Sequence, residues 1–249
     1  MDRTPTKVTT IPTKLEPLEV PLSLAAASRL VEKRGGKDQD DVFAVMVDTA
    51  GDITKAAERV RDTVTKILGN QMNTSIKNAA DARASASKIF TRLAPRLDTV
   101  RQRTEAAIEQ LEQSTQPPRP KDVAAGIYAG ECRAALLRMS PAERACTVEQ
   151  AISDGDDAFV AAAVSGNVAL TGLGKAEAVA LCEAWRRKRH RSTVERITRL
   201  RAGLDEFNRV SSLLGGWSLG VLADKNAAID AATRSAELAA KAVATAEVA

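Results

Sequence analysis

The sequence has very few aromatic residues. Phe, Trp and Tyr make up 3% of the 249 residues, whereas hydrophobic residues as a whole make up 44%. A core of this chain must therefore consist mainly of Ala, Leu, Val and Ile. Small apolar side chains favour close helix–helix packing, whereas β-sandwich layers favour β-branched and aromatic residues. No segment shows a convincing strand-like alternation, so the sequence predicts an all-α fold, a long N-terminal hairpin followed by a C-terminal helical bundle.

The chain contains one histidine, which limits its chemistry. His190 lies between Arg189 and Arg191, whose positive charges would repel a metal ion, and Cys182 is not at ligand spacing from it. The carboxylates of Asp154–Asp157 lack the remaining ligands of a calcium loop, and a helix cap explains them instead. We therefore expect no catalytic residues, no cofactor and no metal, and the chain is predicted not to be an enzyme.

Cysteines and long apolar runs are also scarce. The three cysteines, Cys132, Cys146 and Cys182, are odd in number and widely spaced, which argues against a disulfide framework. Reduced, buried thiols and a cytosolic origin are expected. The longest apolar run, Ala158–Val164, is too short to cross a bilayer, and no signal peptide is evident near the N-terminus. No membrane partner is expected.

Prolines divide the chain into predicted segments. Four prolines within the first 24 residues remove backbone donors and disfavour a helix, so this segment is predicted to be an extended arm. It is either a disordered tail or an arm that lies on a neighbouring subunit. The predicted segments are the arm at 1–24, a helical hairpin or coiled-coil region at 25–116, a proline-rich linker at 117–121, and a C-terminal helical region at 122–249.

A heptad-like pattern occupies residues 76–111. Its apolar positions alternate steps of three and four, which is typical of a coiled-coil seam. Pro95 lies within this pattern and should kink or divide the helix. An ordinary amphipathic bundle helix explains the pattern equally well, so both interpretations stay open. In an intermolecular coiled coil the oligomer seam would contain Phe90, Leu93, Leu97, Val100 and Leu111.

The segment ALTGLGKA at 169–176 is one residue away from a phosphate-binding loop. Such a loop needs a Ser or Thr hydroxyl for Mg²⁺, but Ala176 stands at that position, and the preceding segment does not resemble a strand. Gly174 is instead expected to be the N-cap of a helix that begins near Lys175, with Glu177 in its first turn. That helix should extend to Ser212, with a second start signal at Ser192, and a turn is expected at 214–217.

Positive charge is concentrated in one region. Residues 184–201 contain eight basic side chains and one acidic side chain, Glu195, which gives +7 against a net charge of +4 for the whole chain. This stripe could contact nucleic-acid phosphates without base specificity, contact an acidic protein surface, or simply be solvated. The candidate binding residues are Arg186, Arg187, Lys188, Arg189, Arg191, Arg196 and Arg199.

One stretch resembles a pattern in helical proteins of tailed bacteriophages. It consists of EQAISDGDDAFV at 149–160, SG at 165–166 and LTGL at 170–173. The chain departs from the pattern at Gly174, where Ser, Thr or Asp would more usually cap the helix. The resemblance implies a virion or assembly role without catalytic residues, in a virion or the cytoplasm of a bacterial host.

The leading hypothesis is a non-enzymatic structural or assembly protein of a phage particle. Its partners would be copies of itself or other virion proteins. The alternative is a helical module that binds nucleic acid through the basic stripe at 186–201.

Overall fold

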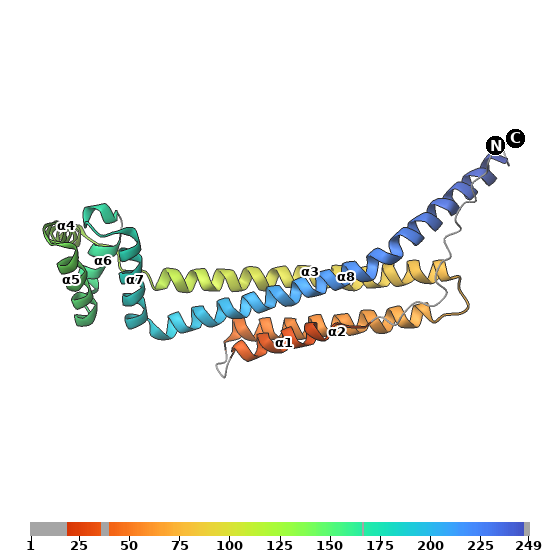
Figure 1. Ribbon diagram of the computed structural model, residues 1–249, viewed down its shortest axis with the longest axis horizontal. Coiled ribbons are helices and arrows are strands. Elements are labelled where there is room, and N and C mark those ends of the chain that lie inside the picture. The colour runs from red at the N-terminus through yellow and green to blue at the C-terminus, as the bar shows by residue number, and fades with distance from the viewer. Residues whose placement is uncertain (1–18, 36–39, 166, 247–249) are drawn as a thin grey trace. The chain divides into compact units, whose positions relative to one another are not determined.

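The computed structural model describes residues 19–35, 40–165 and 167–246, with side chains omitted at 75–76, 168 and 219–246 (Figure 1). Most of the predicted arm lies outside these residues. Its last part does not: the first helix begins at Leu22, directly after Pro21, so residues 22–24 are helical and not extended. Proline suits the position before a first turn because its missing N–H needs no partner there.

Every regular element in the described residues is helical, which confirms the predicted all-α fold. The elements are α1 (Leu22–Gly35), α2 (Asp41–Leu68), α3 (Ser75–Ser114), α4 (Val123–Arg138), α5 (Pro141–Asp154), α6 (Asp157–Val164), the short 3₁₀-helix η1 (Val168–Leu170), α7 (Lys175–Arg189) and α8 (Arg191–Ala246).

The chain forms two compact units. Unit 1 contains residues 1–104 and 202–249, and unit 2 contains residues 105–201. This division differs from the predicted boundary at 117–121. The units are defined by which segments pack together, whereas the prediction used only the prolines of the linker. The return of the chain in α8 brings a distant segment into unit 1, which no local composition signal reveals.

Unit 1 is built around α1 and α2, which lie side by side (Figure 1). The hydroxyl of Ser28 in α1 lies 2.9 Å from that of Thr54 in α2. The buried ring of Phe43 packs directly on two glycines: a Cβ added at Gly35 would lie 2.6 Å from the ring, and one at Gly203 of α8 would lie 2.5 Å from it. The absence of a side chain at these two glycines therefore makes room for the Phe43 ring.

Helix α3 places its predicted seam partly against its own chain. Leu93 and Val100 are buried, and Phe90, Leu97 and Leu111 are partly buried. This burial fits the amphipathic bundle helix, and an intermolecular seam stays a prediction. The helix is not divided at Pro95. That side chain is exposed, so its ring costs one backbone hydrogen bond without disturbing a packed face.

The predicted turn at 214–217 is wrong, because α8 continues through it to Ala246. Neither Gly215 nor Gly216 has a positive φ, so neither is used as a turn residue. The buried face of α8 continues to Leu214, and the ring of Trp217 meets that of Phe90 edge-on at 6.2 Å. Packing on that face outweighs the low helix propensity of two glycines, about 1 kcal/mol each. The predicted long helix is instead interrupted at His190, between α7 and α8.

Unit 2 packs α4 to α7 around a core centred on Trp185, and it also contains the end of α3 and the start of α8. The buried residues of this core are Leu136, Val148, Ile152, Val160, Ala163, Leu173, Ala178, Leu181 and Trp185. The start of α5 is fixed by a capping box: Ser140 accepts from the backbone N–H of Glu143, and the Glu143 carboxylate accepts from that of Ser140. Serine at the N-cap, proline in the first turn and glutamate at the third helical position form a typical helix-start pattern.

Candidate interaction surfaces of unit 2

The buried guanidinium of Arg144 connects three carbonyl groups of unit 2. Its Nε donates to Leu136 O at 3.0 Å and its Nη2 to Met139 O at 2.9 Å, both at the end of α4. Its Nη1 donates to Gly172 O, in the loop before α7. Gly172 has φ of 70°, and a Cβ there would lie 2.8 Å from the guanidinium. The loop therefore requires glycine at this position, for both its backbone conformation and the space that Arg144 occupies.

The phosphate-loop-like segment begins a helix, as expected. Gly174 is the N-cap of α7, and its N–H donates to the Glu177 carboxylate at 3.2 Å. The preceding element is the 3₁₀-helix Val168–Leu170 and not a strand. Lys175 is therefore the first residue of a helix whose start is capped by its own Glu177.

The acidic run between α5 and α6 also acts as a helix boundary. Gly155, with φ of 79°, ends α5 in the left-handed conformation. Asp156 is the N-cap of α6, where its Oδ1 accepts from the N–H of Phe159 at 2.9 Å. The prediction of a helix cap in this run is confirmed. Gly155 and Asp156 therefore define where α5 ends and α6 begins.

Asp157 joins α6 to the end of α7. Its Oδ1 accepts from Trp185 Nε1 at 2.8 Å, and its Oδ2 accepts from Arg189 Nε at 3.1 Å and Nη2 at 2.5 Å. The ring of Trp185 meets that of His190 edge-on at 5.2 Å. Burial alone raises the pKa of Asp157, but the hydrogen bonds from Arg189 and Trp185 outweigh it, so the pKa of this carboxyl lies below its usual range.

The basic stripe is held largely by acceptors within unit 2. Arg186 donates to Thr115 Oγ1 at 2.8 Å and Lys188 donates to Ser153 O at 2.9 Å, while Arg189 binds Asp157. The sequence alone predicts that these side chains face solvent or an anionic partner. It does not reveal the acceptors, which lie 71, 35 and 32 residues away along the chain.

The remaining predicted binding residues lie on the α7–α8 corner. Arg187 pairs with Glu183 at 3.4 Å and Arg191 with Glu195 at 2.9 Å, each within one helical turn. Arg196 and Arg199 also have interactions. An open depression of about 680 Å³ lies at this corner. Its lining residues are Arg187, Arg191, Val194, Glu195, Thr198 and Arg199.

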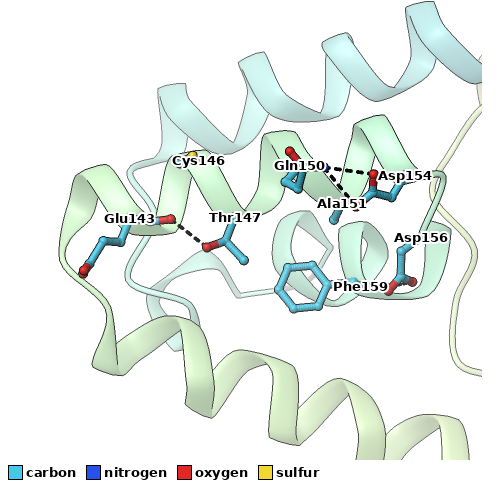
Figure 2. Close-up of a pocket in the computed structure, with 8 residues that line it drawn as sticks. All are labelled: Glu143, Cys146, Thr147, Gln150, Ala151, Asp154, Asp156 and Phe159. Atoms are coloured by element: carbon cyan, nitrogen blue, oxygen red, sulfur yellow. Dashed lines mark hydrogen bonds between the residues drawn. The ribbon is translucent and has the colours of Figure 1, made fainter.

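A second depression, of about 590 Å³, lies between α5 and α6 (Figure 2). Its polar groups are engaged locally. Thr147 donates to Glu143 O at 2.8 Å, and Gln150 donates to the Asp154 carboxylate at 2.9 Å. Hydrogen bonds from Ser140 hold the pKa of Glu143 below its usual range. The lining residues are Glu143, Cys146, Thr147, Gln150, Ala151, Asp154, Asp156 and Phe159.

The cysteines differ in exposure. Cys132 is buried, as expected, whereas Cys182 is partly buried and Cys146 is exposed in the depression of Figure 2. Burial raises the pKa of the Cys182 thiol. All three are unpaired thiols, so no disulfide connects them. Across the described residues, no three His, Cys, Asp or Glu side chains are grouped as a metal site would require.

Helix α4 is apolar on both of its faces. Ala129, Cys132 and Leu136 are buried against the rest of the unit. On the outward side, Val123 is 81% exposed and Ile127 is 59% exposed.

The same outward side contains Leu137, which is 51% exposed, and two glycines. A Cβ added at Gly126 or Gly130 would meet no atom within 4 Å. Each glycine costs a helix interior about 0.5–1 kcal/mol relative to Ala, and nothing in unit 2 requires either of them. Sequence reasoning missed this face, although apolar residues on both sides of a helix are themselves a signal of a second contact.

Comparison with protein-family models, curated proteins and solved structures gives no match to this chain. Among the described helices, none is both long enough and apolar enough to span a membrane.

Proposed function

We propose that the chain is a non-enzymatic structural or assembly protein that associates with other subunits through helix–helix contacts. The observation that supports this most directly is the outward face of α4, where Val123, Ile127 and Leu137 remain exposed on a well-packed unit. Exposed contiguous apolar surface rimmed by polar residues is typical of protein–protein contacts.

The motif residues of unit 2 support a scaffold role. Arg144, Asp156 and Asp157 bind carbonyls, backbone amides and side chains of the same unit. These hydrogen bonds fix the positions of α4 to α7. The unit thereby presents the outward face of α4 on a rigid framework. The resemblance of residues 149–173 to tailed-phage proteins suggests a phage particle as the setting, with copies of the chain or other virion proteins as partners.

Static light scattering of the purified chain over a wide concentration range tests this proposal. We expect an average mass above that of one chain, rising with concentration. A mass equal to one chain at every concentration, with and without other particle proteins, would contradict it.

Nucleic-acid binding is the second candidate, favoured by the depression at the α7–α8 corner. Arg187 and Arg191 line this depression, and each is paired with a glutamate four residues away in the sequence. A phosphate could replace either glutamate as the partner. Binding would weaken steeply with salt, because it would rest on counterion release. It would be lost in Arg187→Ala with Arg191→Ala, whereas Arg61→Ala with Arg92→Ala, in α2 and α3, serves as the charge-matched control. Absent or salt-insensitive binding of DNA and RNA would eliminate this candidate.

A further inference from the structure

We infer that α4 pairs with α4 of a second copy of the chain, antiparallel, about a two-fold axis that passes beside Gly130. This inference rests on the proposed function and specifies its partner and geometry. It is argued from the spacing, the symmetry and the charges of the outward face of α4.

The outward residues of α4 have the spacing of a helix-packing seam. Steps of four, three, four and three residues place them on one stripe of the helix. The stripe lies opposite Cys132, which is buried. A second helix could therefore pack on the stripe without competing with the contacts of unit 2. The stripe consists of Val123, Ile127, Gly130, Ala134 and Leu137.

The stripe is nearly symmetric in kind about Gly130. An antiparallel pair about a two-fold axis brings residues equally far on either side of that point to the same level, and such an interface must be complementary to itself. Seven residues away lie the large apolar Val123 and Leu137. Four residues away lie the small Gly126 and Ala134. Large side chains thus meet large ones at the ends, and small ones meet nearer the centre. The exception is Ile127, three residues from Gly130, which comes level with Arg133, whose Nε donates to Ala162 O within its own unit.

The central glycines explain why the approach can be close. Glycine weakens a helix relative to alanine, yet Gly126 and Gly130 stand in the interior of α4 with open space beside them. Small residues spaced by four let two helix backbones approach closely. A second copy supplies the contact that unit 2 does not.

Charges at the ends of α4 fit the antiparallel direction. Asp122 precedes the first turn and Arg138 ends the last one, eight residues from Gly130 on either side. The pairing puts Asp122 of one copy level with Arg138 of the other, twice, and it also opposes the two helix dipoles favourably. Glu131 is the exception, because its two copies come close to the axis and repel each other.

The size of the contact predicts a weak, reversible dimer. Helix α4 has 16 residues and is therefore about 24 Å long. A standard stable interface buries about 800 Å² on each partner, and a single pair of such helices buries less than this. We therefore expect association that depends on concentration in solution and that is reinforced by other contacts in a larger assembly.

Engineered cysteines in the full chain test the geometry, in a Cys146→Ser background that removes the exposed thiol. A disulfide requires Cα atoms about 4.4–6.8 Å apart. Gly130→Cys should cross-link two copies under mild oxidation. Gly126→Cys should not cross-link. In the antiparallel pair Gly126 comes level with Ala134 of the other copy, so the two cysteines at position 126 would be eight residues, or about 12 Å, apart along the helix axis. Cross-linking at both positions would indicate a parallel pair and overturn the inference.

Substitutions without cross-linking provide the second test, by sedimentation equilibrium. Gly130→Leu should weaken association about tenfold or more, yet keep or raise the thermal midpoint, since leucine favours a helix. Ala135→Leu, at an exposed position off the stripe, should leave association unchanged. Glu131→Gln should strengthen it. If the wild-type chain associates but Gly130→Leu does not weaken it, the inference is wrong and the proposed function stands. If the wild-type chain never associates, both are wrong.

Discussion

Arg144 of α5 and Gly172 of the loop before α7 are bonded directly: the guanidinium Nη1 donates to the glycine carbonyl. The same side chain binds two carbonyls at the end of α4. One buried cation therefore fixes the α4–α5 turn and the entry to α7 together. The outward face of α4 is positioned through this contact.

Gly172→Ala should destabilise unit 2 strongly. The substitution forces alanine into φ of 70° and places its Cβ 2.8 Å from the Arg144 guanidinium. The left-handed conformation and the overlap together should lower the free energy of unfolding by about 2–4 kcal/mol. Urea unfolding followed by the fluorescence of Trp185, with Trp217→Phe as background, measures this change. Gly174→Ala, at φ of −70°, is the control and should have little effect.

Asp157→Ala should destabilise unit 2 by about 1–3 kcal/mol, because the buried Trp185 indole N–H loses its acceptor. The same transition measures it. Asp154→Asn, at an exposed carboxylate that bonds only Gln150 among the contacts described, is the control. A loss no larger than that of the control would contradict the role given to Asp157.

The contribution of the Asp157 carboxylate should depend on pH. Its folded pKa lies below the unfolded value of about 3.9. Its stabilisation is therefore present above pH 4 and lost as pH falls through the folded pKa. The difference in unfolding free energy between wild type and Asp157→Asn should be constant at neutral pH and shrink below pH 4. A difference that grows on acidification would contradict this assignment.

Arg189→Ala and Arg187→Ala should differ, although the two arginines are neighbours in the basic stripe. Arg189 binds Asp157 through two nitrogen atoms, whereas Arg187 pairs only with Glu183 one turn away. The unfolding midpoint of unit 2 should fall in Arg189→Ala and stay close to wild type in Arg187→Ala. Equal midpoints would mean that the stripe has no structural role.

Gly203→Ala should destabilise unit 1. Its Cβ would lie 2.5 Å from the buried Phe43 ring, so the ring or α8 must shift, at a cost of about 1–3 kcal/mol. Hydrogen exchange of α2 amides measures the loss. Gly51→Ala, in the same unit, has open space around its Cβ and should slow exchange slightly instead.

Local signals in the sequence predicted the helices of unit 2 well. The helix cap in the acidic run 154–157, the helix start near Lys175 and the all-α fold follow from residues within one or two turns. Contacts that depend on distant residues were not predictable in this way. The acceptor of Arg186 lies 71 residues away, and Gly215 and Gly216 are helical because the face of α8 packs on both sides of them.

The outward face of α4 was missed for a different reason. Its apolar residues are spread around the helix, with Glu131 and Arg133 between them, so no one-sided pattern distinguishes the stripe that faces the unit from the stripe that faces outward. Only the burial of Ala129, Cys132 and Leu136 separates the two. Once these buried residues are known, the exposed apolar residues of α4 are recognised as a separate face.

Sedimentation velocity over a range of concentrations tests the central claim most directly, in three forms of the full chain. The wild-type chain should associate, and Ile127→Gln with Leu137→Gln on the α4 face should remain a single chain at all concentrations. Val179→Gln, at a 63% exposed valine on α7, should associate like the wild type. Association of the α4 double variant equal to that of the wild type would contradict the account.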